Sequence, residues 1–555
     1  MKRWADILWL LLVGLYSSAW CVTAAAQLGA TFDEPHHLNA GLTAWRTGSN
    51  KLLMSAGCMP LPVDVQTLPI YLWEQFRPEP FHQYQDIATI LPVARAANLV
   101  FWWVFLVYAM RLGRTWGGAW GGRFAVGLVG FDPNFLGHAA LATTDISIAA
   151  TMLALVYHTH HGAGRGWWPR VFVPGVGFGL ATLAKASGMV FGGQAFLVIG
   201  VWHLAKTGAL TPPPGSSWRA AAAHVWHAGY GLRKDIAASL LIGFTLVFAY
   251  TGCDWGVEPT FVTWAARLPD GPVKDALVPV STNLRVFPNA GEALVQQIKH
   301  NMRGHGTYLL GEWHHRATVA YFPVALSMKT PLPALLLILL TLVLRPRAWN
   351  TPAGWLALVL LLFSFNCRVQ IGVRFMFTLM AVSYVCAACA SRGWLRWFAA
   401  GCVIVTAAVS AAAWPHGLSY FNRLWGDPEQ GYTRLHDSNY DWGQGLPELK
   451  AWYAANGGDR PLAVWYYGTD PAILYPPFKL THLSFAPLAT GDEIPDLAGR
   501  GYLAVSVSAL YGDRAITPSS RVASDWLLAR EPVARTHTFL IYDLSNSKSE
   551  ARNSK

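Results

Sequence analysis

Two adjacent carboxylates follow the first long apolar run of the sequence. Asp33 and Glu34 stand in the stretch Thr31-Phe32-Asp33-Glu34-Pro35-His36-His37, just beyond an apolar run from Ile7 to Ala26. That run is long enough to cross a bilayer, which takes roughly 20 apolar residues. Paired carboxylates at the point where a membrane helix meets water indicate chemistry at a membrane surface.

The composition is that of a membrane protein with many spans. Of the 555 residues, 53% are hydrophobic, only 13% are charged and 27 are Trp. Such a chain cannot form one soluble core, so we expect a polytopic α-helical membrane protein. Lys2, Arg3 and Ala24-Ala25-Ala26 give the first run the look of a signal peptide. Because similar runs recur along the chain, we interpret the first one as a retained helix.

About eleven transmembrane helices are expected. Beside the first run, apolar spans lie near 92–110, 119–141, 145–158, 171–184, 188–204, 236–253, 331–344, 354–366, 373–390 and 397–413. Alternate loops carry Lys and Arg and almost no acid. Because basic loops stay on the cytoplasmic side, we expect the amino terminus inside and, with an odd number of spans, the carboxyl terminus outside an inner (cytoplasmic) membrane. The net charge of +11 then reflects topology among membrane lipids, and no nucleic-acid partner is expected.

Three long segments are expected on the outer face, at 28–91, 254–330 and 414–555. The first two are rich in Pro and Trp, which suits short helices lying in the membrane interface. The third has a helix signal at 446–453 and strand-like runs at 462–467, 502–507 and 538–542. We therefore expect a transmembrane catalytic domain over 1–413, a small extracytoplasmic α/β domain over 414–545 and a disordered tail over 546–555.

Motifs along most of the chain resemble one enzyme family. No phosphate-binding Walker loop, dinucleotide fingerprint or serine-hydrolase elbow stands in a credible context. The acidic pair, followed by His37 and Gly41, resembles the first outer loop of the protein O-mannosyltransferase-like group of GT-C glycosyltransferases. Further matches occur at 131–138 with 143–145, 179–185, 321–324 with 329–332, 372–374 and 437–444. Their order from residue 31 to about 470 carries the resemblance.

The resemblance implies transfer of a sugar from a polyprenyl-phosphate donor to an acceptor hydroxyl on the outer face. The hydroxyl is a poor nucleophile, so a carboxylate must take its proton, and that base is assigned to Asp33. Glu34 either holds Asp33, accepts from a sugar hydroxyl or starts the next helix. Backside displacement by a single acting carboxylate implies inversion at the anomeric carbon. The sugar is expected to be mannose or another hexose, and the acceptor a protein or a glycolipid.

Three basic residues are candidates for binding the donor phosphate, whose charge grows as it leaves. Arg95, Lys185 and Arg374 each fall near the outer end of a span. A cation at membrane depth is costly unless it is paired, which favours function, whereas snorkelling to lipid headgroups is the alternative. The family's usual His-Pro-Pro-Leu motif and base are missing at 57–64, and either an altered donor or phosphate binding by Arg95 or Arg374 would account for this departure.

Other polar residues are expected to contact substrate. Asp145 follows Thr143-Thr144 at an outer helix start, where capping is the structural alternative. His138 belongs to a family-like motif. Asp437, Asp441 and Trp442 open the outer domain, and they either complete the acceptor site or dock this domain on the membrane part; the two interpretations are equally supported.

A divalent metal is an open alternative, and so is a different class of protein. His37 and Glu312, with their neighbours His36, His314 and His315, could supply ligands, although histidine pairs on wet loops are more often surface residues. A polytopic lipid or sugar transporter, or a flippase, would also carry many spans and buried charges. No inverted repeat is evident and the acids gather on one face, which favours an enzyme.

Overall fold

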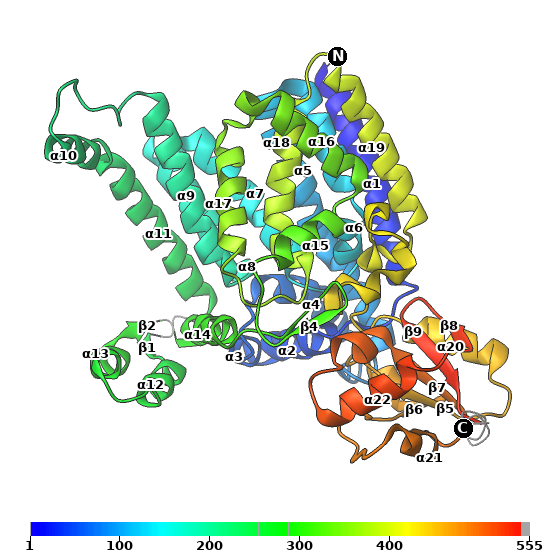
Figure 1. Cartoon of the computed structure of the whole chain (residues 1–555). Helices are drawn as coiled ribbons and strands as arrows, with labels where there is room; N and C mark the ends of the chain where they lie inside the picture. The colour runs from blue at the N-terminus through cyan, green and yellow to red at the C-terminus, as the bar shows by residue number, and fades with distance from the viewer. Residues whose placement is uncertain (1, 253–254, 287, 546–555) are drawn as a thin grey trace.

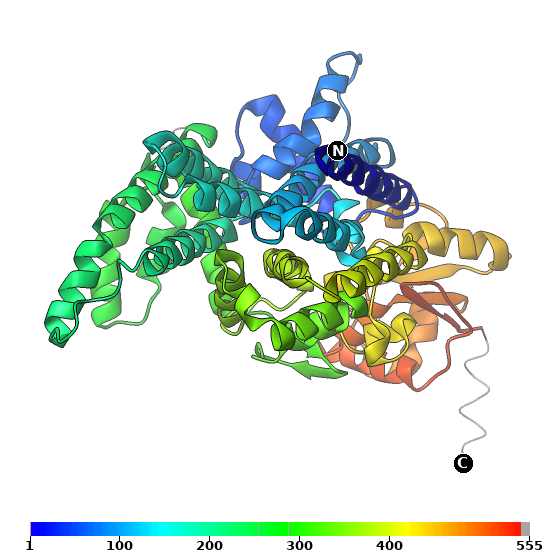
Figure 2. The same cartoon turned by 90° about the horizontal axis from the view of Figure 1, so that it is seen from above.

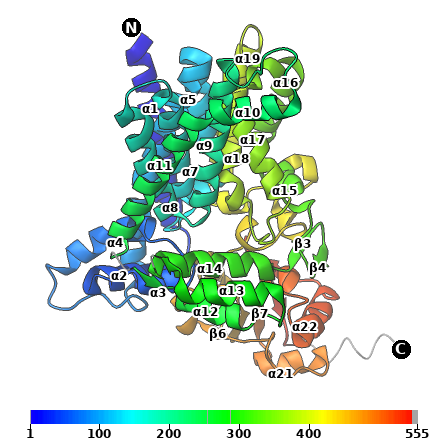
Figure 3. The ribbon, with the colours of Figure 1, turned by 90° about the vertical axis from the view of Figure 1, so that its left-hand side faces the viewer.

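A bundle of helices forms the body of the protein, and a second layer covers one end of it (Figures 1 and 3). The structure is a computed structural model that describes residues 2–252, 255–286 and 288–545; the predicted tail at 546–555 lies outside these residues. The bundle consists of α1 (Lys2–Ala25), α5 (Ile87–Gly130), α7 (Asp145–Gly162), α8 (Val173–Ala184), α9 (Ser187–Lys206), α11 (Tyr230–Tyr250), α16 (Leu332–Leu344), α17 (Pro352–Ser364), α18 (Phe377–Ala390) and α19 (Leu395–Ala412).

The polytopic helical fold class is confirmed, and the number of spans stays a prediction. Within the described residues, five helices are long and apolar enough to cross a membrane, or six if the pair α15 (Tyr321–Lys329) and α16, bent by 117°, is one span. The sequence predicts about eleven. The other bundle helices are shorter, or they carry polar turns at one end, as α7 does with its terminal histidines and α11 with its first charged turn.

Local chemistry explains where the predicted spans break. The long helix α5 contains Gly118 at φ 67°, ψ −159°, a conformation outside the helical region that glycine adopts freely, so a kink separates its two halves. The span expected at 119–141 ends earlier, at Gly130. There Asp132 accepts a hydrogen bond from the backbone N–H of Asn134 and starts the short helix α6 (Pro133–Ala139).

The layer at one end of the bundle gathers the three segments expected on the outer face; we call this end the sheet side (Figures 1 and 3). Helix α1 begins at the opposite end, where α10 (Trp218–Ala228) also lies (Figure 1). Seen from above, the segment coloured for residues near 220 lies at one edge of the bundle (Figure 2). The layer contains α2 (Glu34–Thr47), α3 (Lys51–Ser55), α4 (Leu61–Glu74), α12 (Pro259–Ala266), α13 (Pro272–Asn283), α14 (Pro288–Arg303) and the small pairs β1 (Gly256–Val257) with β2 (Arg285–Val286) and β3 (Thr307–Leu309) with β4 (Glu312–His314).

A five-stranded sheet with three helices forms the C-terminal part of this layer. Its strand order is β6-β5-β7-β9-β8; β5 is parallel to β6 and β7, and β9 is antiparallel to β7 and β8. Alternate residues of the strands enter two apolar clusters, one on each face, so the sheet is buried on both sides. The elements are β5 (Leu462–Trp465), β6 (Phe478–Leu480), β7 (Tyr502–Ser506), β8 (Ala534–Arg535), β9 (Phe539–Asp543), α20 (Leu446–Asn456), α21 (Ile494–Ala498) and α22 (Pro518–Leu528).

The loop that precedes α2 is tied to the sheet-side layer by backbone hydrogen bonds. The Gly29 N–H donates to the carbonyl of Gln444 at 2.9 Å, and the Phe32 N–H donates to that of Trp442 at 2.9 Å. The Ala30 N–H donates to the Asp470 carboxylate at 2.8 Å. The position of the acidic pair is therefore set by contacts with residues more than 400 positions later in the chain.

Candidate active site

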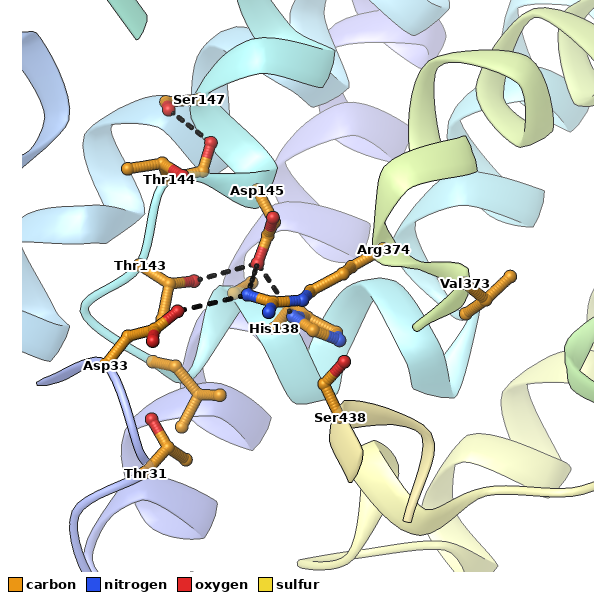
Figure 4. Close-up of polar contacts among 12 residues, drawn as sticks. Thr31, Asp33, His138, Thr143, Thr144, Asp145, Ser147, Val373, Arg374 and Ser438 are labelled. Atoms are coloured by element: carbon orange, nitrogen blue, oxygen red, sulfur yellow. Dashed lines mark hydrogen bonds and ion pairs between the residues drawn. The ribbon is translucent and has the colours of Figure 1, made fainter. Parts of the chain in front are cut away.

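Asp145 is the centre of an ion network at the sheet-side end of the bundle (Figure 4). Its side chain is fully buried at the first position of α7. One carboxylate oxygen lies 2.7 Å from Lys185 Nζ. The other lies 3.6 Å from Arg374 Nη1 and 3.3 Å from His138 Nδ1. Residues from α6, α7, the end of α8 and the 3-10 turn η3 (Val373–Met376) thus meet at one carboxylate.

Arg374 and Lys185 are the two cations of this site. The side chain of Arg374 is 8% exposed, and that of Lys185 is 21% exposed. The Arg374 guanidinium lies over the Trp442 ring, 4.1 Å from its centroid, and its buried Nε has no hydrogen-bond partner within the described residues. Asp145 therefore holds two positive groups side by side, and Arg374 keeps donor capacity for an anion.

Asp33 is the exposed carboxylate of the network. It occupies the N-cap position of α2, and its side chain is 36% exposed. One carboxylate oxygen accepts a hydrogen bond of 3.2 Å from Arg374 Nη1. A carboxylate that solvent can reach is the group that a general base needs, because the hydroxyl whose proton it takes must come within hydrogen-bond distance.

Glu34 and Arg95 form a separate, fully buried pair. Arg95 donates from Nε and Nη2 to the two Glu34 oxygens at 2.8 and 2.7 Å. Its remaining N–H groups donate to the backbone carbonyls of Ala25, Leu28 and Gly29. All five guanidinium donors are used, and the side chain is 2% exposed. The expected phosphate contact by Arg95 and sugar contact by Glu34 do not fit this geometry, because neither group has a free, accessible atom.

The Glu34 carboxylate also fixes the loop beneath Asp145. It accepts from the backbone N–H of Thr31 at 2.8 Å and from that of Ala142 at 2.7 Å. These hydrogen bonds and Arg95 hold the pKa of Glu34 below its usual value despite its burial. The pair is thus a positioning element, and it joins the acidic loop to the start of α7.

Removal of the Arg95 guanidinium is expected to destabilise the fold strongly. Arg95→Met leaves a buried, uncompensated carboxylate, a change that costs roughly 3–5 kcal/mol. The control is Arg460→Met, which breaks an ion pair whose Arg and Asp side chains are 49% and 27% exposed and should cost at most about 1 kcal/mol. Thermal denaturation of the two purified variants measures the difference; equal melting temperatures would contradict the positioning role.

The segment from Asp437 to Gln444 serves mainly as a docking turn. Asp437 adopts φ 58° and accepts from Tyr467 Oη and from the Ser438 N–H. Asp441 is fully buried and accepts from the N–H groups of Gly443 and Ser508. Of the three expected substrate contacts in this segment, the Trp442 ring touches the ion network at Arg374, and the Asp437 carboxylate is near enough for its charge to act on the same guanidinium. The docking interpretation is therefore favoured for Asp441, whereas Asp437 lies between the docking turn and the network. His138 is 2% exposed and packs against Phe377.

Lys329 begins the family-like motif at 329–332, but it is not among the predicted site residues. Its buried ammonium group donates to the carbonyls of Leu418 at 2.8 Å and Asn439 at 2.6 Å. The Asn439 amide oxygen in turn accepts from the backbone N–H of Val373 at 3.0 Å. This chain of contacts fixes the turn that carries Arg374. A lysine just before an apolar run was the available signal, since a cation at membrane depth needs partners.

The predicted metal ligands do not form a cluster. His37 is buried, and its Nδ1 lies 3.2 Å from the carbonyl oxygen of Ala142. Glu312 is exposed on the separate strand β4. Among the described residues, no group of three or more His, Cys, Asp and Glu side chains is arranged to hold a metal ion. His37 and Glu312 belong to different substructures. Their residue types suit a metal site, but residue type does not show where the two side chains lie in the fold.

Burial raises the pKa of two carboxyl groups in the C-terminal part, that of Asp441 to about 7 and that of Asp513 to about 8. Unfolded aspartates titrate near pH 3.9, so the folded protein binds more protons between about pH 4 and pH 8, and stability falls as the pH rises through this window. Asp513→Asn should weaken this dependence and raise the melting temperature at pH 8.5 by a few degrees. Melting curves at pH 5.5 and 8.5 check this, with exposed Asp459→Asn as control; an unchanged slope would contradict it.

Comparisons with known proteins give matches among solved structures only; no family and no curated protein matches the sequence. ArnT from Cupriavidus metallidurans bound to undecaprenyl phosphate matches with a TM-score of 0.46 and 14% identity, over 96% of this chain and 97% of that chain. The Archaeoglobus fulgidus oligosaccharyltransferase in the apo form matches at 0.42 and 12%, over 93% and 71%. The S. cerevisiae protein O-mannosyltransferase Pmt1-Pmt2 complex bound to the sugar donor matches at 0.34 and 14%, over 48% and 37%. All three matches have TM-scores below 0.5 and sequence identities of 12–14%.

Proposed function

We propose that this protein is an inverting glycosyltransferase that moves a sugar, mannose or another hexose, from a polyprenyl-phosphate donor to an acceptor hydroxyl. One observation carries the proposal. The exposed carboxylate of Asp33 lies in the same ion network as Arg374 and Lys185, at the end of a bundle of apolar helices. A base for a hydroxyl group and cations for a phosphate are thus available at one place.

The proposed step uses these residues in distinct roles. Asp33 takes the proton of the acceptor hydroxyl as its oxygen forms a bond to the anomeric carbon. The bond between that carbon and the phosphate oxygen breaks, and the phosphate keeps the electron pair. Arg374 and Lys185 stabilise the added negative charge, while Asp145 holds both cations in place. Attack from the face opposite the leaving group inverts the anomeric configuration.

The placement of the site supports a reaction on one side of the membrane. The ion network adjoins the sheet-side layer, whereas the basic loops predicted as cytoplasmic lead to the opposite end (Figure 3). We place the sheet side outside an inner membrane, with residues 1–413 as the catalytic part and 414–545 as the outer domain. The partners are then a lipid-linked sugar donor and an acceptor protein or glycolipid.

Sugar transfer in proteoliposomes tests the proposal. Purified protein is reconstituted with radiolabelled polyprenyl-phosphate mannose and a membrane extract as a source of acceptors. Label that enters protein or glycolipid only when the purified protein is present supports the proposed glycosyltransferase activity. If the donor crosses the bilayer without any transfer of label, with mannose and with other hexoses, the protein is a transporter and the proposal is wrong.

A further inference from the structure

A large groove lies against α16 and α19, away from the ion network. Its volume is about 1060 Å³, and its walls include Leu336, Val405 and Val409. It extends along α19 from Trp397 to Trp414, a rise of roughly 25 Å at 1.5 Å per residue. Trp397 is 74% exposed and Val405 is 49% exposed. Such a surface on a membrane helix is covered by lipid chains.

The sheet-side end of this groove is polar, and two distant segments build it. His416 follows α19, and His537 lies between β8 and β9. Their rings are stacked, with centroids 3.8 Å apart and planes 7° from parallel. His416 Nδ1 and His537 Nε2 are buried and have no hydrogen-bond partner in the described part of the chain. Burial lowers the pKa of His416 to about 4 and holds that of His537 well below its usual value, so both rings are neutral at pH 7.

Charged groups of both signs complete this polar end. The exposed Arg423 makes no ion pair with any residue that the structure describes. Asp427 and Glu429 lie on the same rim and are also exposed; Glu429 is 3.4 Å from Arg535. The rim therefore offers the cation Arg423, unpaired within the described residues, the carboxylate of Asp427, the Glu429–Arg535 ion pair and two neutral imidazoles.

We propose that this groove binds a zwitterionic phospholipid of the phosphatidylethanolamine class from the sheet-side leaflet. Its acyl chains pack against α16 and α19, and Arg423 pairs with its phosphate. Asp427 and Glu429 attract its ammonium group, and the imidazoles of His416 and His537 hydrogen-bond to its ester and phosphate oxygens. An anionic lipid without an amine, including a polyprenyl phosphate, would leave the Asp427 carboxylate without a counter-charge, so the site differs from that of the proposed sugar donor.

The bound lipid would support the wall behind the candidate active site. The Tyr440 ring is stacked on His537, with centroids 5.3 Å apart. Ser419, which lines the groove, donates to the carbonyl of Tyr440 at 2.5 Å. Two residues further on, Trp442 lies against Arg374. The lipid thus joins the membrane helices to the turn that docks the sheet-side layer, and this binding site does not depend on the proposed reaction.

Native mass spectrometry of the full-length protein tests the site. The protein is exchanged into nanodiscs that contain equal amounts of phosphatidylethanolamine and phosphatidylglycerol, with undecaprenyl phosphate as a third, minor lipid. We expect one phosphatidylethanolamine to be retained at least about tenfold over phosphatidylglycerol. Asp427→Asn with Glu429→Gln should reduce this ratio to about one, whereas the exposed Asp459→Asn should leave it unchanged.

A second variant separates lipid loss from local unfolding of the rim. Val405→Trp fills the groove from the lipid-facing side of α19 and leaves the rim intact, so it should remove the retained lipid whatever its headgroup. Equal retention of both phospholipids by the wild type would mean an unselective lipid surface and overturn the proposal. Preferential retention of undecaprenyl phosphate that Val405→Trp abolishes would assign the groove to the donor and also overturn it.

Discussion

Asp33→Asn is expected to lower the rate of sugar transfer by about 10²–10⁴-fold, the usual contribution of a general base. The amide cannot accept the acceptor proton, but it preserves the shape of the side chain and still offers an oxygen to Arg374. Because the Asp33 side chain is 36% exposed, the change should alter folding little. Initial rates with a saturating lipid-linked donor, together with a melting curve, measure both effects.

Asp86→Asn is the matched control for this variant. Asp86 is also a partly exposed aspartate at a helix N-cap position in the same predicted outer loop, at the start of α5. It makes no ion pair with the described residues, so its amide should transfer sugar at the wild-type rate. If Asp33→Asn kept full activity while Asp86→Asn lost it, the base would be assigned to the wrong carboxylate.

The elements of the fold were largely predictable because they depend on local patterns. The strand-like runs at 462–467, 502–507 and 538–542 correspond to β5, β7 and β9, and the apolar runs correspond to helices of the bundle. Local patterns do not show how helix ends are built. Asp132 therefore starts a new helix inside a run that was expected to continue as a single span.

The roles of the buried charges were harder to predict, because they depend on distant partners. Arg95 and Arg374 are the same residue type at similar predicted depths. Only the structure shows that Arg95 is saturated by Glu34 and three carbonyl groups, whereas Arg374 keeps a free donor. The partners of Arg95 lie more than 60 positions away, so no spacing rule in the sequence could distinguish the two arginines.

The role of an aspartate in the C-terminal part was hard to predict for the same reason, because it too depends on distant partners. The sequence left Asp441 open between substrate contact and docking, since an acid beside a Trp suits both. Its burial between the N–H groups of Gly443 and Ser508 follows from the pairing of the sheet-side layer, which brings residues 67 positions apart together. Candidate residues could thus be found by type, but their division into reacting and positioning groups needed the packed structure.

Arg374→Gln is expected to weaken both donor binding and catalysis, with a fall of roughly 10²–10³-fold in kcat/KM. The variant removes the guanidinium that lies beside Asp33 and Asp145. This group also carries an N–H donor, at Nε, that has no hydrogen-bond partner among the described residues. Asp145 keeps Lys185 at 2.7 Å, so the buried carboxylate is still paired and the fold should survive. Arg374→Lys should recover only part of the activity, because a point charge does not reproduce the planar fork of donors.

The control for Arg374 is an arginine six positions earlier on the same segment. Arg368 is exposed and makes no ion pair with the described residues, so Arg368→Gln removes the same charge without touching the network. Binding of unlabelled polyprenyl phosphate, measured apart from turnover, shows whether the lost activity comes from the phosphate contact. Weaker binding by Arg374→Gln but not by Arg368→Gln assigns the phosphate to Arg374. Equal binding by both would leave Lys185 as the phosphate ligand and limit Arg374 to orienting Asp33.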